Sequence, residues 1–206
     1  MRIVNVELAE ITGAFIGDGY LSRYGNRQYL LGFAGHSVLD KAYFQHLFVL
    51  IKRNFPSSNP HIYFRSDENT VMLKVYSKAV FLSFKKLGFS EGEKSRTVKI
   101  PLEIASEPKL MNACLRGIFD TDGCVFLDRR KKYLHPYPRI TLQSASLDLI
   151  SQIEAYLLRT FDLYVNKANR DGYRNYVEIY GHRQVEIFLK QIGFSNDRHL
   201  SKLMPP

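Results

Sequence analysis

Hydrophobic and polar positions follow two rhythms along this chain, and the same series of rhythms occurs twice. Apolar residues at helical spacing predict amphipathic helices over residues 39–55 and 147–161. Two-residue alternation around turn residues predicts four hairpins, which span residues 20–34, 61–76, 124–145 and 164–180. Shorter helical patterns lead each series and close it at Gly88 and Gly193. The pattern therefore predicts an α+β protein built from two αββαββα units.

The two halves also match residue by residue. The pattern G-x-F-x-x-D-G begins at Gly13 and again at Gly117, which is an offset of 104. KKLGFS (85–90) matches KQIGFS (190–195), and VLDKAYF (38–44) matches SLDLISQI (146–153). Because the order is kept and the offset barely changes, we interpret the chain as two repeats over residues 1–105 and 106–206.

The leading helix of each half carries signals at both ends. Asn5 is the predicted N-cap of the first helix. Ser106, followed by Pro108 in the first turn, is its predicted counterpart in the second. Gly19 and Gly123 stand where a helix end favours a left-handed residue. Both helices are therefore expected to stop directly after an aspartate.

Those two aspartates, Asp18 and Asp122, stand at the unfavourable end of a helix, where a carboxylate is repelled by about 0.3–1 kcal/mol. Small residues four apart, in GAFIG (13–17) and GIFDT (117–121), allow two helices to approach closely and would bring the acids together. Divalent metal ions would relieve both repulsions, and paired metal ions support phosphodiester cleavage. The alternative for either acid alone is an ordinary Asp-Gly turn.

Composition narrows the class of partner. The 206 residues carry a formal net charge of +9, which favours a polyanion, nucleic acid first and an anionic membrane surface second. No apolar run approaches the length of a membrane span, about 18 residues. No signal-peptide pattern opens the chain, and its two cysteines lack zinc-site spacing. We therefore expect an intracellular protein of the cytoplasm or nucleoid, with an organelle as the alternative.

The paired motifs resemble those of the LAGLIDADG homing endonucleases, specifically the single-chain members with two pseudo-symmetric repeats. ITGAFIGDG (11–19) and LRGIFDTDG (115–123) fall on the nine-residue motif of that family, and the predicted unit follows each. The resemblance implies two antiparallel sheets that form a saddle around two central packed helices. It also implies two or three Mg²⁺ or Mn²⁺ ions, with Asp18, Asp122, Gly17 and Thr121 as the residues of the metal site.

The resemblance implies further catalytic residues. Lys94 and Arg198 match the basic position near each scissile phosphate, and His199 is the alternative to Arg198. Lys41 matches a second basic position whose counterpart is Ile150, so two unequal active sites are expected. The sixth motif position holds Asp120 in one repeat and Ile16 in the other. Asp120 therefore receives no catalytic role.

Cationic and polar side chains on the predicted strands are the expected contacts to DNA, because alternate strand residues face one side of a sheet. An ordinary solvated surface is the alternative for the run at 129–132. The expected DNA-binding residues are Arg23, Arg27, Gln28, Arg65, Lys74, Arg129, Arg130, Lys131, Lys132, Arg139, Lys167, Arg170 and Arg174.

We therefore expect a monomeric endonuclease that makes a metal-dependent double-strand break with 3′ overhangs at a specific DNA site. No splicing signature flanks the repeats, so an intron-encoded enzyme is expected rather than an intein. Intron RNA is a second expected partner, and a membrane is not expected. The alternatives are an RNA-binding intron maturase and a catalytically silent DNA-binding regulator on the same scaffold.

Overall fold

Each half of the chain folds into the same series of helices and strands in the computed structural model, which describes residues 4–25, 28–170 and 174–203. The elements of the first half are α1 (Val6–Asp18), β1 (Gly19–Tyr24), β2 (Gln28–His36), α2 (Lys41–Asn54), β3 (Pro60–Arg65), the single 3-10 turn η1 (Ser66–Glu68), β4 (Thr70–Tyr76) and α3 (Lys78–Lys86). Those of the second half are α5 (Pro108–Asp122), β5 (Gly123–Asp128), β6 (Tyr137–Ser144), α6 (Leu147–Phe161), β7 (Asn166–Arg170), β8 (Arg174–Tyr180) and α7 (His182–Gln191).

Two short helices lie outside the repeated series. Helix α4 (Leu102–Ala105) links the halves, and α8 (Asp197–Leu200) follows the second one. The expected boundary after residue 105 falls at the end of α4, and the ranges 1–105 and 106–206 for the two repeats stay a prediction.

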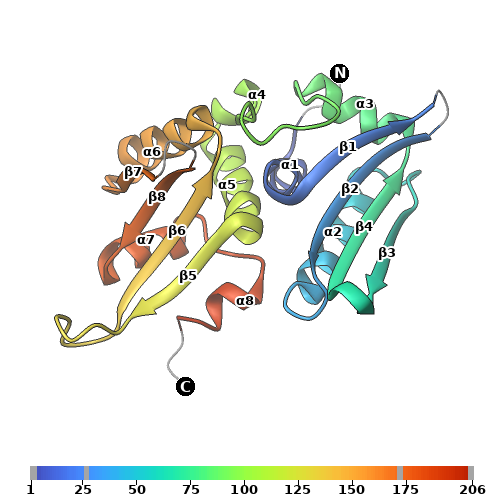
Figure 1. Cartoon of the computed structure of the whole chain (residues 1–206). Coiled ribbons are helices and arrows are strands. Elements are labelled where there is room, and N and C mark those ends of the chain that lie inside the picture. The colour runs from blue at the N-terminus through green and yellow to red at the C-terminus, as the bar shows by residue number, and fades with distance from the viewer. Residues whose placement is uncertain (1–3, 26–27, 171–173, 204–206) are drawn as a thin grey trace.

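Each half contributes one antiparallel four-stranded sheet. The strand orders are β1-β2-β4-β3 and β5-β6-β8-β7, so the two sheets have the same topology. The sheets flank the central pair α1 and α5 (Figure 1). Helices α2 and α3 pack on one face of the first sheet, and α6 and α7 pack on the corresponding face of the second. The opposite face of each sheet carries no helix, which leaves two open faces on the same side of the molecule.

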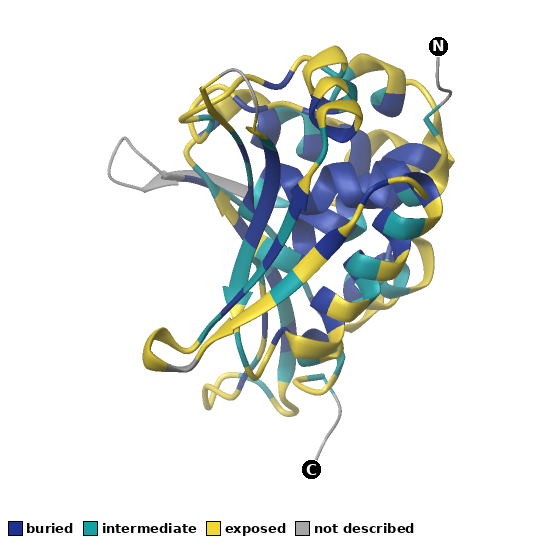
Figure 2. Cartoon of the chain, turned by 90° about the vertical axis from the view of Figure 1, so that its right-hand side faces the viewer, coloured by how far each residue is buried: buried dark blue, intermediate teal, exposed yellow. Residues whose placement is uncertain are grey.

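The central helices are the most buried part of the fold (Figure 2). A Cβ on Gly13 would overlap the Cys114 carbonyl oxygen, and one on Gly117 would overlap the Glu10 carbonyl oxygen. Glycine at both positions therefore lets the two backbones touch. One apolar core runs through this contact from the first sheet to the second.

The two ends of the leading helices differ in detail from expectation. The N-cap prediction for Asn5 is confirmed, since its side chain accepts the Leu8 amide at 2.8 Å. The prediction for Ser106 is wrong, because Glu107 is the N-cap of α5 and Ser106 ends α4. The helix and its proline nevertheless start where expected, with Pro108 in the first turn.

The left-handed conformation predicted for Gly19 and Gly123 is also wrong. Their φ angles are −86° and −70°, which is extended backbone. A side chain on either residue would collide with the last turn of its own helix, at Phe15 and at Phe119. The chain therefore needs glycine here for close approach at the turn from helix to strand, not for backbone handedness.

No helix in the described part of the chain is both long enough and apolar enough to span a membrane.

Candidate active site

The C-terminal ends of α1 and α5 bring two acids together. Asp18 and Asp122 are the last residues of the two helices. A Cβ on Gly17 would lie 3.2 Å from the carboxyl carbon of Asp122, so the end of one helix contacts the acid of the other. The small residues of both motifs thus place the carboxylates side by side, as the spacing predicted.

Both carboxyl groups lie in surroundings that oppose their ionisation. Burial and the neighbouring Asp122 raise the pKa of Asp18 to about 7. Burial also raises the pKa of Asp122, against the pull of Lys94 and Arg198. Asp18 is half-buried and Asp122 keeps contact with solvent. The pair is therefore partly withdrawn from water but still open to solvent at Asp122.

Lys94 caps the end of α1. It lies in the loop after α3, and its ammonium donates to the carbonyl oxygens of Ile16 at 2.8 Å and Gly17 at 2.9 Å. The ammonium also lies over the Phe15 ring, 5.4 Å from its centre. Burial lowers the pKa of Lys94, while the two acids oppose that change.

Arg198 caps the end of α5 in the same way. Its guanidinium donates to the carbonyl oxygens of Thr121 at 2.6 Å and Asp120 at 3.1 Å. These oxygens are 104 residues after those that Lys94 contacts, and Arg198 is 104 residues after Lys94. The two cations are therefore equivalent members of one pseudo-symmetric arrangement around the acids.

His199, the alternative to Arg198, is turned away from the acids. Its ring is buried, stacks on Phe194 with centres 4.6 Å apart, and lies 3.1 Å from the Asp120 carbonyl oxygen through Nε2. Burial lowers the pKa of His199 to about 4. Arg198 is thus the cation that meets the helix end.

Asp120 is buried and holds the loop that leads into α8, the helix that carries Arg198. Its carboxylate accepts the backbone amides of Ser195 at 3.0 Å and Asn196 at 2.9 Å. Burial raises the pKa of Asp120 to about 7 in spite of these bonds. Asp120 therefore positions a loop, a role compatible with the absence of an acid at Ile16.

Two residues of this arrangement were not found from the sequence. Asp40 pairs with Arg198 at 2.8 Å, and Asn196 donates its side-chain amide to Asp40 at 2.8 Å. Asp40 stands at the N-cap position of α2 but makes no side-chain capping bond there. A sequence reading takes an aspartate before a helix as a cap, so nothing in the pattern pointed to Arg198.

Comparisons with known proteins identify the fold that carries this arrangement. The LAGLIDADG-like domain matches residues 109–193. The fold is similar to that of I-DmoI in complex with DNA and Mn, with a TM-score of 0.63 and 18% identity over 92% of this chain and 98% of that chain. It is also similar to I-WcaI bound to its DNA recognition sequence, with a TM-score of 0.64 and 17% identity over 100% of this chain and 89% of that chain.

The chain has the two-repeat LAGLIDADG fold, and its second repeat carries the LAGLIDADG-like domain. The predicted family resemblance and the predicted fold are both confirmed. The same fold occurs in the N-terminal LAGLIDADG domain of DUF199/WhiA, with a TM-score of 0.59 and 17% identity over 96% of this chain and 88% of that one. The replication factor C small subunit of Methanocaldococcus jannaschii is 32% identical over 97% of this chain. The chain spans only about 10% of the length of that relative.

The LAGLIDADG helix ends offer oxygen ligands for a divalent cation. Two carboxylates and nearby backbone carbonyls are the hard donors that Mg²⁺ prefers, and Mg²⁺ commonly completes its shell with water and substrate phosphates. Among the described residues, no group of three or more Asp, Glu, His or Cys side chains is placed so that it could hold a metal ion by itself. The carbonyl oxygens of Gly17 and Thr121 accept hydrogen bonds from Lys94 and Arg198. The donor set fits a metal that is shared between protein and DNA.

A pocket of about 210 Å³ opens beside Lys94 and Asp122. Gln143 and Ser144, at the end of β6, line its other side. The repeat that supplies Lys94 and the repeat that supplies β6 therefore meet at this pocket.

Lys41 lies elsewhere. Its side chain is exposed, and its ammonium is 5.9 Å from the centre of the Phe64 ring on β3. The contact that the structure describes for Lys41 is with this ring rather than with either acid, so we leave Lys41 out of the catalytic set proposed below.

Three of the expected DNA-binding residues lie on the open face of the first sheet. Leu31, Phe33 and Leu73 define the core face, and strand pairing places alternate residues on the opposite one. The residues of the open face include Gln28, Arg65 and Lys74. Lys74 lies 5.6 Å from the centre of the Tyr63 ring, and Arg65 pairs with Glu68.

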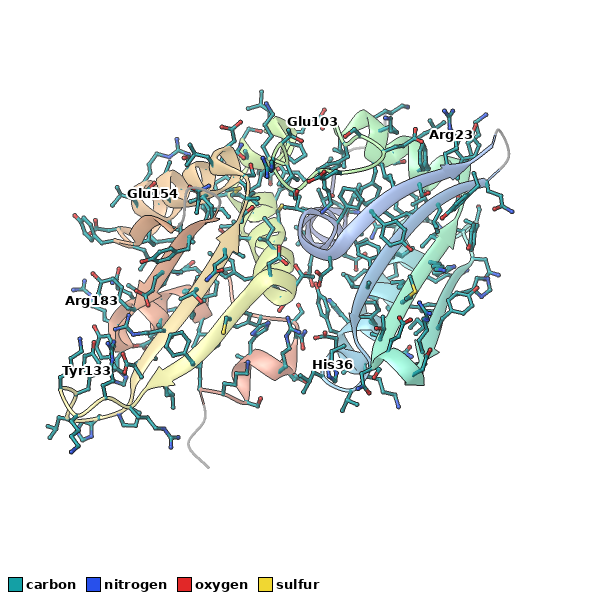
Figure 3. The ribbon with its side chains drawn as sticks, in the orientation of Figure 1. Arg23, His36, Glu103, Tyr133, Glu154 and Arg183 are labelled. Atoms are coloured by element: carbon teal, nitrogen blue, oxygen red, sulfur yellow. The ribbon has the colours of Figure 1, made fainter. Side chains whose placement is uncertain are left out.

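Arg23 lies on the other side of that sheet. It is paired with Tyr29 across the strands, in step with core residues such as Leu21 and Leu31. Its guanidinium is 3.7 Å from Glu91 (Figure 3 labels Arg23 on β1). Arg23 therefore faces the helices and the loop behind the sheet instead of the open face.

The expected cations of the second repeat fall into three groups. Arg129, Lys131 and Lys132 are exposed in the β5–β6 connection. Arg130 and Arg139 form ion pairs with the buried Asp128, and Arg139 also pairs with Glu178. Lys167, Arg170 and Arg174 lie on β7 and β8, and only the backbone of these three residues is described; Arg27 lies outside the described residues.

Proposed function

We propose that this protein is a site-specific DNA endonuclease that makes a double-strand break, depends on Mg²⁺ or Mn²⁺ and leaves 3′ overhangs. The observation that carries the proposal is the symmetric arrangement at the helix ends. Asp18 and Asp122 lie side by side, and each helix end also carries one cation, Lys94 or Arg198. Two cations around two acids provide one half-site for each strand of a duplex.

The acids and the cations of this site have different proposed roles in cleavage. Divalent ions, when bound, polarise the scissile phosphate and make bound water a stronger nucleophile. The Asp18 and Asp122 carboxylates hold them, and close packing of the helices fixes the separation of the acids. Lys94 and Arg198 lie next to the acids and can balance charge that develops on phosphate oxygens. The rigid glycine contact keeps these groups in place with little reorganisation.

The open faces supply the duplex contact. Strands can enter the major groove, where base edges are distinguishable, while most cations hold phosphates. Lys74, Arg65 and Gln28 on the first sheet would serve this role. Arg129, Lys131 and Lys132 extend it beyond the second sheet. We keep Lys167, Arg170, Arg174 and Arg27 in this set as proposals.

The similar structures support a metal and DNA requirement, since I-DmoI structures contain DNA with Mn or with Ca. We extend this to the present chain as a proposal, together with action as a monomer, an intron-encoded origin and contact with intron RNA. The long relative carries its matching segment within a chain about ten times as long. The proposed intron-encoded origin is therefore a separate proposal from the proposed cleavage chemistry.

The test is selection of cleaved sites from a randomised duplex library, followed by an assay on a plasmid that carries the selected site. Linear product with Mg²⁺ and none with a chelator is the expected result, and sequencing of the ends should show 3′ overhangs. Duplex binding without cutting in Mg²⁺ or Mn²⁺ would contradict the proposal and favour a DNA-binding regulator. Binding to structured RNA alone would favour a maturase.

A further inference from the structure

The position before the second long helix of each repeat reaches across to the other repeat. Asp40 precedes α2 and Ser146 precedes α6, and both side chains are buried. Ser146 caps its helix by accepting the Leu149 amide at 3.2 Å. Its hydroxyl also donates to the Val98 carbonyl oxygen at 2.6 Å, in the loop that carries Lys94. This contact holds the backbone of the loop and does not touch the Lys94 ammonium.

Asp40 makes a different contact from the same position. Both of its carboxylate oxygens lie within 3.0 Å of the guanidinium Nη1 of Arg198. The same oxygens accept the side-chain amide of Asn196 and the backbone amide of His36, each at 2.8 Å. Asp40 is thus fully engaged and fixed, and it pairs with the cation itself.

Arg198 is held from two sides as a result. One side of its guanidinium meets the carboxylate of Asp40, and the other meets the carbonyl oxygens at the end of α5. Lys94 bonds to backbone oxygens alone, and no ion pair involves it among residues 4–25, 28–170 and 174–203. The two cations are therefore equivalent in place but not in how they are held.

We infer that Asp40 is a positioning residue for Arg198, so that cleavage of one DNA strand depends on Asp40 and cleavage of the other does not. This inference rests on the proposed function. An arginine has many rotamers, and a carboxylate that engages it restricts them. Without the charge of Asp40 the guanidinium loses its ion-pair partner and keeps only neutral acceptors, which are the carbonyl oxygens at the end of α5 and Nε2 of His199. A displacement of about 1 Å at a reacting centre costs on the order of 10²-fold in rate.

The first experiment compares Asp40→Asn with a charge-matched control. Asp148 is the counterpart of Asp40 in the sequence repeat, but it is exposed in the first turn of α6. On a supercoiled plasmid labelled separately on each strand, Asp40→Asn should slow one strand on the order of 10²-fold and leave nicked circles. The other strand should be cut near the parental rate, and Asp148→Asn should cut both strands like the parent. Equal slowing of both strands by Asp40→Asn would overturn the inference.

The second experiment is a double-mutant cycle with Arg198→Met. If Asp40 acts only through Arg198, the double variant should cut the affected strand no more slowly than Arg198→Met alone. Asp40→Glu, which keeps the charge, should restore part of the lost rate. Additive losses in the double variant would show that Asp40 acts independently of Arg198, and would overturn the inference.

The four proteins of this cycle, which are the parent, Asp40→Asn, Arg198→Met and the double variant, also distinguish a failure of this inference from a failure of the proposed function. If the parent does not cut in Mg²⁺, the proposed function fails. A thermal-unfolding cycle without DNA or metal then decides the pairing: the loss of Tm in the double variant should be smaller than the sum of the two single losses. Additive losses of Tm would mean that Asp40 does not hold Arg198.

Discussion

Asp18 and Asp122 are single residues whose positions conflict with their charge. Each ends a helix at the pole that repels an anion, and burial raises the pKa of both. Lys94 and Arg198 partly offset this electrostatic repulsion, because they donate hydrogen bonds to the carbonyl oxygens of the same helix ends. At this scale the site is a compact cluster of two carboxyl groups and two cations, and it is accessible to a metal ion and to a phosphate group.

A second charged cluster lies at the middle of α1 and predicts a pH dependence of stability. Glu10 is buried and accepts His46 at 2.7 Å, Ser195 at 2.8 Å and Arg116 at 3.2 Å. The hydrogen bond to Glu10 raises the pKa of His46. Burial works to raise the pKa of Glu10, but the bonds from His46 and Ser195 outweigh it and lower that pKa.

A raised histidine pKa contributes stability below the unfolded pKa, about 6.5, and that contribution is lost as the pH rises through the folded pKa. A lowered glutamate pKa contributes above its unfolded pKa, about 4.3, and is lost in acid. His46→Gln should therefore lower Tm by roughly 1–4 °C near pH 5.5. The difference from the parent should shrink as the pH rises above the folded pKa of His46. His61→Gln on the open face is the control, and a pH-independent difference for His46→Gln would contradict this assignment.

Gly13 and Gly117 set the contact between α1 and α5 at the scale of elements. Gly117→Val would place a side chain against the backbone of Glu10 and Ala14, and overpacking of this kind costs about 1–3 kcal/mol. We expect a lower free energy of unfolding in denaturant titrations, and slower cutting because the acids separate. Ala79→Val, on an exposed position of α3, should leave cutting unchanged and cost only the lower helix propensity of valine, about 0.5 kcal/mol. Parental stability and cutting for Gly117→Val would mean that the helices tolerate separation.

The β5–β6 connection is organised by Arg139. Its guanidinium bonds to Asp128 at 3.1 Å, to the Tyr133 hydroxyl at 2.9 Å and to Glu178 at 2.5 Å. Tyr133 stacks on Tyr137 with ring centres 4.4 Å apart, at the tip of the hairpin (Figure 3). The hydrogen bonds from Arg130 hold the pKa of Asp128 below its ordinary range. Arg139 therefore supports the exposed cations Arg129, Lys131 and Lys132 rather than joining them.

Arg139→Met should loosen this hairpin. The change removes the partner that Asp128 and Glu178 share, while Asp128 keeps its ion pair with Arg130. Amide hydrogen exchange of residues 129–136 should quicken, and duplex affinity should fall for every sequence. Arg129→Met, at an exposed neighbouring position, is the control. It should lower duplex affinity but leave the amide hydrogen exchange of residues 129–136 as in the parent. If amide hydrogen exchange of residues 129–136 is unchanged in Arg139→Met, Arg139 does not support the hairpin, and a loss of affinity would then indicate a direct contact with DNA.

The order of elements could be predicted because the repeat supplies every pattern twice. Lys94 and Arg198 were predicted from the family resemblance, and their separation of 104 residues supports the pair. Which face a strand residue occupies could not be predicted. Arg23 and Tyr24 are neighbours, and only the pairing register assigns Arg23 to the helix side. Asp40 was missed for a related reason, since its contact with Arg198 joins residues 158 positions apart.

Both repeats contribute basic residues to the whole molecule, and the formal charge is +9. If strand and hairpin cations neutralise phosphates, log affinity should fall linearly with log salt. Six phosphate contacts would give a slope of about −5, from about −0.9 per phosphate. The combined change of residues 129–132 to alanine should weaken binding to all duplexes and make the slope shallower. A nearly flat slope for the parent would contradict duplex binding through these surfaces.

The central claim is that Asp18 and Asp122 form one metal-dependent cleavage centre. Asp18→Asn and Asp122→Asn remove a strained charge, so both variants should keep or gain thermal stability without divalent ions and still bind the target duplex. The decisive measurement is cleavage of a supercoiled plasmid carrying the target site in Mg²⁺, scored for nicked and linear product. Because the acids lie side by side, we expect each variant to lose linear product and to cut both strands far more slowly. Full linearisation at the parental rate by either variant would contradict the claim.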